Sequence, residues 1–139
     1  MNMKKVIINI IIAFMTLCAC QRDNNYSLLC KNGYRYWREN NGNGKEKVSI
    51  HYFDKDGQWL LFEGCTKGFY ETGYELSLRK QGKWNFLKDN VMEIAHKRYS
   101  VISMGPSLIV LQREGKKAQL LFSPMKAEEI PDNYKMLWK

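Results

Sequence analysis

The 139-residue chain holds little of the material from which metal centres and nucleophilic active sites are built, with four Cys, two His and three Pro. No third ligand stands near His51 or His96 at the spacing of a metal site, so the sequence predicts no metal centre and no cofactor. No glycine-flanked nucleophile motif is present either. We therefore expect a protein that is not an enzyme and has no catalytic residues.

A long hydrophobic run is also missing. The apolar segment from Val6 to Met15, broken only by Asn9, has about ten residues, whereas a membrane-spanning helix needs about 20. Lys4 and Lys5 precede it, and a basic start before a short apolar run is typical of a secretory signal peptide.

Leu17-Cys18-Ala19-Cys20 follows this run and resembles the lipobox of bacterial lipoproteins. The resemblance implies a signal peptide at residues 1–19, diacylglycerol transfer to Cys20 and acylation, usually by palmitate, of the new amino group. Two or three acyl chains anchor a protein durably to a membrane. The alternative is an ordinary secretory signal that leaves Cys20 free.

Residues 20–27 would then be the lipidated Cys and a tether before a domain at 28–139. Gln21, not Asp, follows Cys20, which by the same resemblance favours the outer membrane over retention in the inner one. Whether the domain faces the periplasm or the cell surface is left open.

Cys30 and Cys65 are the thiols that remain in such a mature chain, in an oxidising compartment. A disulfide between them would close a loop of about 36 residues and stabilise the fold by roughly 3–4 kcal/mol. The alternative is two separate, buried thiols. The spacing along the chain is compatible with both arrangements, so the disulfide is a hypothesis that depends on the distance between the two Cα atoms.

Helical periodicity is scarce, and turn residues recur every eight to twelve positions, with period-two alternation between them. Hairpin-sized loops predict antiparallel neighbours, and a sheet of many short strands hides its edges by closing. We expect an all-β, up-and-down meander of about eight or nine strands closing into a small barrel. The expected strands cover residues 34–38, 47–53, 58–62, 74–79, 83–87, 91–96, 99–104, 108–112 and 117–122.

Two of these strands, 58–62 and 108–112, are apolar on both faces and should be covered on both sides. After the last strand, residues 127–138 place apolar side chains at helix-like spacing, interrupted by Pro131. We expect a short helical or loop tail packed over a barrel end.

The order of landmarks is similar to that of the lipocalin-like domains of small bacterial lipoproteins. An apolar-Gly-aromatic opening is followed by an aromatic strand into a D-x-D-G turn, a Trp-containing hairpin and a closing pair of strands. These landmarks are Leu29, Gly33, Tyr36, Trp37, 52–57, 84–94, 99–102 and 108–111. The resemblance implies a barrel and says little about activity.

Three further patterns have ordinary structural interpretations. His51 and His96 are expected to face solvent from strands. The segment 54–57 is expected to be a hairpin turn, not a calcium loop, because Glu63 lies beyond an apolar strand. Surplus aromatic residues near loops or ends fit either a barrel mouth or core anchors: Tyr26, Tyr34, Phe69, Tyr70 and Trp138.

Basic charge exceeds acidic charge, with 22 Lys and Arg against 14 Asp and Glu. Six basic residues fall at two expected hairpin turns, and we expect these turns to share one barrel end as a patch for an anionic partner: Arg79, Lys80, Lys83, Arg113, Lys116 and Lys117. The alternative is solubilising charge. Outside the cytoplasm the partner would be lipid headgroups, lipopolysaccharide or an acidic protein, not nucleic acid.

Together these features predict an outer-membrane-anchored lipoprotein with a non-catalytic binding domain for a small apolar ligand or an envelope component. The alternative is an inhibitor or immunity lipoprotein that blocks a toxin or hydrolase through basic loops. A deep apolar cavity would favour the first, and a filled barrel the second.

Overall fold

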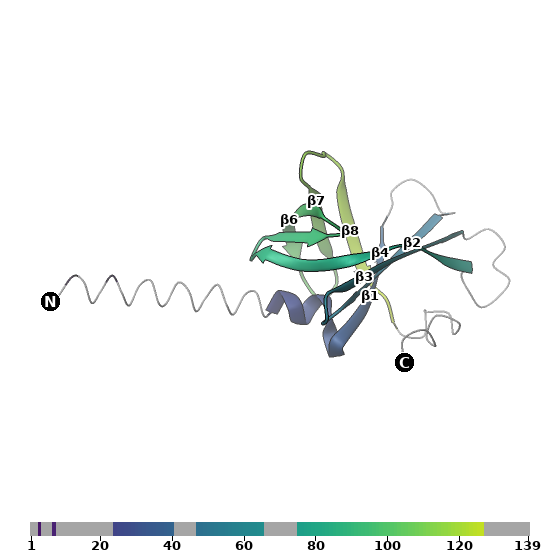
Figure 1. Cartoon of the computed structure of the whole chain (residues 1–139), viewed down its shortest axis with the longest axis horizontal. Coiled ribbons are helices and arrows are strands. Elements are labelled where there is room, and N and C mark those ends of the chain that lie inside the picture. Colours follow the sequence, from purple (N-terminus) through teal and green to yellow (C-terminus); the bar gives the residue numbers. More distant parts are fainter. Residues whose placement is uncertain (1–2, 4–6, 8–23, 41–46, 66–74, 127–139) are drawn as a thin grey trace.

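The computed structural model describes residues 3, 7, 24–40, 47–65 and 75–126. Within this part, eight antiparallel strands, each paired with the next in the chain, close into a barrel through pairing of the first with the last (Figure 1). The predicted meander and barrel are confirmed. The strands are β1 (Tyr34–Glu39), β2 (Lys47–Asp54), β3 (Gln58–Cys65), β4 (Glu75–Lys88), β5 (Val91–Ile94), β6 (Lys97–Met104), β7 (Ile109–Arg113) and β8 (Gln119–Pro124).

Apart from residues 3 and 7, the predicted signal peptide lies outside the described residues, as do Cys20 and the tail after residue 126. No helix in the described part is both long and apolar enough to cross a membrane.

Successive side chains along each strand point alternately into the barrel and to its outside. Trp37, Phe53, Trp84 and Phe122 point inward and are at most 3% exposed. They belong to one interior cluster of buried side chains: Leu29, Cys30, Trp37, Phe53, Trp59, Leu61, Trp84, Phe86, Met92, Ile94, Tyr99, Ile109, Leu111 and Phe122. Large rings therefore fill the barrel along its described strands.

The predicted separation of strands 74–79 and 83–87 by a turn at Gln81-Gly82 is wrong, since β4 runs through these two residues as one strand of 14 residues. Gly82 serves a different purpose there. A Cβ atom at this position would stand 3.0 Å from the Cβ of Ala95, so the missing side chain lets the β5–β6 hairpin approach β4. The strand bends at a register shift opposite Leu61 and Phe62. Eight strands, not nine, follow from this continuity.

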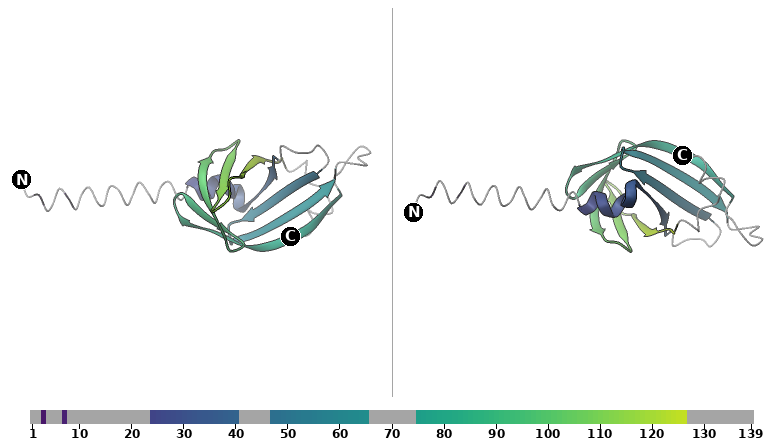
Figure 2. Two further views of the ribbon diagram at one scale, coloured as in Figure 1. Left: turned by 90° about the horizontal axis from the view of Figure 1, so that it is seen from above. Right: turned by 90° about the horizontal axis from the view of Figure 1, so that it is seen from below.

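One end of the barrel is plugged by a helix at residues 24–29, followed by the 3-10 turn η1 (Lys31–Gly33). In Figure 1 the helix lies below the barrel, and in the view from below in Figure 2 it lies in front of the strands. The Asn25 amide donates to the Asp89 carbonyl (3.2 Å), and the Trp37 indole donates to the Leu29 carbonyl (3.1 Å). Tyr26 packs against the rings of β4, with its centroid 5.1 Å from that of Trp84. We call this the plugged end.

Strands β1 to β3 also bury their outward-facing side chains. A second cluster consists of Tyr36, Val48, Ile50, Tyr52, Leu60, Phe62 and Met125. The expectation that strand 58–62 is covered on both faces is thus confirmed. For strand 108–112 it is wrong, because Ile109 and Leu111 are fully buried while Leu108 is 39% exposed.

The predicted turn at 54–57 joins β2 to β3 and is confirmed. The Asp54 carboxylate accepts hydrogen bonds from the backbone N–H groups of Asp56 (3.0 Å) and Gln58 (2.8 Å). Its carbonyl accepts from the Trp84 indole (3.0 Å), while Gly57 accepts from the Trp84 N–H (2.9 Å). The turn is therefore tied directly to the interior cluster.

Gly57→Ala should destabilise the fold more than Gly115→Ala. Both glycines have positive φ (85° and 75°), so each substitution carries a backbone strain of about 1 kcal/mol or more. Only at Gly57 would the new Cβ also meet a backbone atom, the Trp84 carbonyl oxygen at 3.2 Å. Urea midpoints of the two variants measure the difference, and equal losses would contradict this account.

Candidate binding surface at the hairpin end of the barrel

The end opposite the plugged end carries the β5–β6 and β7–β8 hairpins, and we call it the hairpin end. The β7–β8 loop is at the top of Figure 1, on the far side of the barrel from the helix. Interior-facing positions become polar toward this end. Glu39 is the last residue of β1, and Arg113 is the last residue of β7.

His51 lies inside the barrel near this end, not in solvent as predicted, and is 5% exposed. Its Nε2 atom is 2.8 Å from a Glu39 carboxylate oxygen, and its Nδ1 atom accepts a hydrogen bond from the Trp59 indole (3.0 Å). An indole N–H can only donate, so the proton of the neutral ring is on Nε2 and is donated to Glu39. The ring also packs against Phe122, with centroids 4.6 Å apart. His51 is thus a satisfied core residue.

The polar interior continues from Glu39 to Tyr99 and Arg113. Tyr99 and Arg113 are directly paired across β6 and β7, so both side chains point to the same face. Burial raises the pKa of Tyr99, the positive charge of Arg113 opposes that rise, and the Glu39 carboxylate adds to it. The three groups are therefore close enough to interact electrostatically.

An open hollow of about 460 Å³ lies between the two hairpins. Its lining residues are His96, Lys97, Arg98, Arg113, Glu114 and Gly115. A backbone hydrogen bond from the Glu114 N–H to the Arg98 carbonyl (3.0 Å) holds the hairpins together. The lining holds three basic residues, Lys97, Arg98 and Arg113, and one acidic residue, Glu114, so the hollow has a net positive charge that suits an anionic group.

Both hairpins have fixed backbones. Ala95 and His96 form the two-residue β5–β6 loop with φ of 50° and 65°, the signs that a type I′ turn requires. Non-glycine residues in this region carry strain, which is common at functional positions. On the other hairpin, the Gln112 amide donates to the carbonyls of Lys116 (3.0 Å) and Lys117 (3.3 Å). The basic residues of the two hairpins are therefore attached to backbone segments whose conformation is fixed by these turns and hydrogen bonds.

The predicted basic patch is only partly brought together. Arg113 lines the hollow, and Lys116 and Lys117 lie in the loop beside it. The remaining predicted members are not at a turn but within β4: Arg79, Lys80 and Lys83. Their expected place depended on the turn at Gln81-Gly82, which the strand runs through.

The β4 residues of the predicted patch point in different directions. Arg79 lies at the register shift, with its guanidinium 3.8 Å from the Glu63 carboxylate. Lys80 pairs with Leu61 and so shares the interior face, whereas Lys83 pairs with Gln58. The hollow is lined instead by His96, Lys97 and Arg98. The predicted strands 91–96 and 99–104 divide these consecutive basic residues between a strand and a turn. Placing the turn at Ala95-His96 would have revealed this basic run.

The predicted Cys30–Cys65 disulfide is not formed, since Cys30 is a free, buried thiol. It lies at the plugged end, where burial and the charge of Asp54 raise its pKa to about 12. Cys65 ends β3 opposite Lys47, seven residues along β2 from Asp54, or about 24 Å at 3.4 Å per residue. A disulfide needs Cα atoms within about 7 Å, so this register keeps the two residues apart.

The predicted aromatic mouth also finds no support among the described residues. Tyr26 packs into the core at the plugged end, and Tyr34 stacks on Tyr52 of the outer face, with centroids 5.9 Å apart. Phe69, Tyr70 and Trp138 lie outside the described residues.

In residues 24–40, 47–65 and 75–126, no three His, Cys, Asp or Glu side chains are placed to hold a metal ion. No family model, curated protein or solved structure matches the chain.

His51→Asn should destabilise the barrel, whereas His96→Asn should not. The shorter side chain at 51 cannot reach both Glu39 and Trp59, and an orphaned buried polar group costs about 1–3 kcal/mol. His96 is exposed at positive φ, which Asn tolerates, so its substitution should stay within about 0.5 kcal/mol. Thermal unfolding of the pair is the measurement, and a larger loss in His96→Asn would refute the assignment.

Proposed function

We propose that this protein is an envelope lipoprotein, anchored to the outer membrane through acyl chains on Cys20, whose lipocalin-like barrel is a non-catalytic binding domain. Its partner is an acidic protein surface, engaged by the hairpin end. The observation that carries the proposal is the open hollow whose lining contains Lys97, Arg98 and Arg113 and a single acidic residue, Glu114.

The filled interior supports a protein partner over a small apolar ligand. Phe53, Phe86 and Met92 are at most 1% exposed within the barrel, and they occupy the space that a ligand would need. The hollow, in contrast, is open and formed by two hairpin loops and the strand ends beside them, as a site for a partner's acidic side chains would be. A role as inhibitor or immunity protein fits this arrangement, because blocking requires binding alone.

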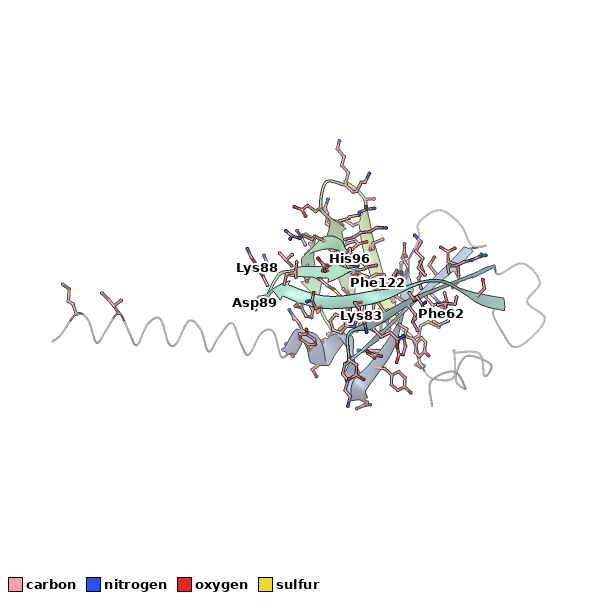
Figure 3. The ribbon with its side chains drawn as sticks, in the orientation of Figure 1. Phe62, Lys83, Lys88, Asp89, His96 and Phe122 are labelled. Atoms are coloured by element: carbon pink, nitrogen blue, oxygen red, sulfur yellow. The ribbon has the colours of Figure 1, made fainter. Side chains whose placement is uncertain are left out.

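The position of the tether supports a partner other than the anchoring membrane. The tether enters through the helix at 24–29, which packs at the plugged end, while the basic hollow is at the hairpin end. Figure 3 labels Lys88 and Asp89 at the end of β4, where Asp89 accepts a hydrogen bond from Asn25 of that helix, and shows His96 set apart from them. A domain held at one end presents the other end away from its membrane.

Reversing two charges of the hollow should weaken binding to an acidic polypeptide. The variant Lys97→Glu/Arg113→Glu is compared with Lys31→Glu/Lys55→Glu, an equal charge change at the plugged end. Immobilised poly-L-glutamate serves as the probe, at low and at physiological salt. We expect binding of the parent that declines with salt, because exposed charges are screened over about 8 Å, and a clear loss only in the first variant.

Equal loss in both variants, or no binding by the parent at low salt, would contradict a specific basic end. Vesicles with anionic phosphatidylglycerol form the second arm of the experiment. Binding to vesicles that depends on Lys97 and Arg113, without binding to poly-L-glutamate, would replace the acidic protein with a lipid surface.

The anchor is tested separately. Cys20→Ala should abolish metabolic labelling by a clickable palmitate analogue and move the protein from the membrane fraction to the soluble envelope fraction, because the acyl chains supply the anchor. Cys18→Ala is the matched control and should leave both unchanged. Labelling that persists in Cys20→Ala would show that the lipobox interpretation is wrong.

A further inference from the structure

The exposed apolar side chains of the barrel gather at one end. In residues 24–40, 47–65 and 75–126, five large apolar side chains are exposed, and four of them belong to the plugged end. We call these four the apolar rim: Tyr34, Leu87, Ile102 and Leu108, which are 37–55% exposed. Single exposed apolar residues are ordinary on a protein surface, whereas several at one end indicate a surface that meets another molecule.

Two rim residues lie beside the start of the N-terminal helix. The Asp89 carbonyl accepts the hydrogen bond from Asn25 of the helix, and Leu87 lies two residues before Asp89. The residue before Ile102 donates its N–H to the Asn90 carbonyl (2.8 Å), which brings Ile102 next to the same β4–β5 turn. The helix and these two side chains therefore share one side of the plugged end.

The other two rim residues lie beside the end of the same helix. The Arg35 guanidinium donates to the Leu28 carbonyl (3.0 Å) and is 3.5 Å from the Pro106 carbonyl oxygen in the β6–β7 loop. Leu108 is in this loop, and Tyr34 immediately precedes Arg35 as the first residue of β1. The rim thus places apolar side chains around the helix through which the chain enters the barrel.

We infer that the plugged end rests on the anchoring membrane with the apolar rim inserted among the lipid headgroups, an inference that rests on the proposed acyl anchor at Cys20. Cys20 is four residues from Asn24, the first residue of the helix, so their Cα atoms are at most about 14 Å apart. One headgroup layer is about 5–8 Å thick. Acyl chains on Cys20 therefore leave the plugged end little distance from the lipid.

The helix is fixed to the barrel, so the short tether also determines which way the barrel faces. Asn25 is bonded to the β4–β5 turn near the start of the helix, and the Leu29 carbonyl accepts from the Trp37 indole at its end. Between them, the Tyr26 ring packs on Phe86 with centroids 5.0 Å apart. A barrel held in this way keeps its hairpin end pointed away from the membrane.

Charge contributes little to this contact. Among the described residues of the plugged end, three exposed lysines are offset by three aspartates: Lys31, Lys55, Lys88, Asp54, Asp56 and Asp89. The contact therefore depends on apolar area, since interfacial binding grows with the apolar surface that enters the headgroup region. The hairpin end differs, because basic residues outnumber acidic ones in its hollow.

Photo-cross-linking to lipid tests the contact. Leu87→p-benzoylphenylalanine and Ile102→p-benzoylphenylalanine are prepared in the mature acylated protein, in vesicles of phosphatidylethanolamine and phosphatidylglycerol that contain a fluorescent phospholipid. Leu78→p-benzoylphenylalanine is the matched control, because Leu78 is 48% exposed on the same strand as Leu87, about 30 Å along it. After illumination, denaturing gels should show several-fold more fluorescent lipid attached at positions 87 and 102 than at 78.

Flotation of the same vesicles reports the anchor independently. Equal attachment at all three positions, or none at 87 and 102 in protein that floats, would overturn the rim contact and leave the anchor in place. A covalent dimer linked through position 102 would assign the rim to self-association and would also overturn the membrane contact. Protein that does not float would overturn the proposed anchor, and the rim contact with it.

An acidic substitution in the rim provides a second readout. Ile102→Asp should lower lipid attachment from Leu87→p-benzoylphenylalanine several-fold, because a charged side chain is costly to move out of water. Leu78→Asp, an equal change away from the rim, should leave the attachment unchanged. Both positions are exposed, so both melting temperatures should stay close to that of the parent and exclude a loss of folding. Undiminished attachment in Ile102→Asp would contradict a contact made by the rim.

Discussion

The contact between Trp84 and the β2–β3 turn is the interaction on which the arrangement of this barrel depends. The indole donates to the Asp54 carbonyl, and the Trp84 N–H donates to the Gly57 carbonyl, so one residue of β4 clamps the preceding hairpin. The same ring packs against Phe53 and Phe86 at 5.7 and 5.8 Å. Buried hydrogen bonds of this kind fix one geometry, because leaving either partner unpaired inside the barrel costs about 1–3 kcal/mol. The clamp positions the β2–β3 turn and the C-terminal part of β4 relative to each other, and Tyr26 of the helix at 24–29 packs against the same Trp84 ring.

That geometry divides the molecule into two ends with different properties. Rings and the N-terminal helix close the plugged end, and polar side chains are gathered toward the hairpin end. Glu39 illustrates the transition, since it binds His51 within the core and also influences Tyr99 beside Arg113. The separation matters for function, because a rigid scaffold with charged loops at one end can present them without rearranging its core.

Much of the fold can be predicted from the sequence, because strand alternation and turn formation each depend on residues that are close together in the chain. The Asp54–Gly57 turn and the alternation from Val48 to Phe53 determine their strands without reference to the rest of the chain. Gly82 was misread because its role is nonlocal: the residue that needs the space, Ala95, is far along the sequence and reaches it only after β4 and β5 pair. His51 was misread for a similar reason. Its two partners, Glu39 and Trp59, come from β1 and β3. The alternation within β2 puts His51 and Ile50 on opposite faces of the strand, but it does not show which face points into the barrel.

The site was less predictable than the fold. Arg113, Lys116 and Lys117 were identified correctly as basic residues at a hairpin, because their turn was correct. Arg79, Lys80 and Lys83 were assigned to a turn that does not exist, and Lys97 was missed because its turn was shifted by two residues. A charged surface forms where loops become neighbours in space. Strand order predicts which loops are neighbours only when the first and last residues of every strand are predicted correctly. The same limit applies to Cys30 and Cys65, whose separation follows from register and not from spacing.

The close approach of Gly82 and Ala95 has a consequence for how this sequence can change over evolutionary time. With 3.0 Å between a Cβ at position 82 and the Cβ of Ala95, a side chain can be gained at one position only if one is lost at the other. Glycine at 95 would also relieve the positive φ there. The two positions therefore form a reciprocal pair, and divergent copies of this barrel are expected to carry glycine at one or both of them. Such covariation would mark the β4–β5 contact in sequences from which every other landmark has been lost.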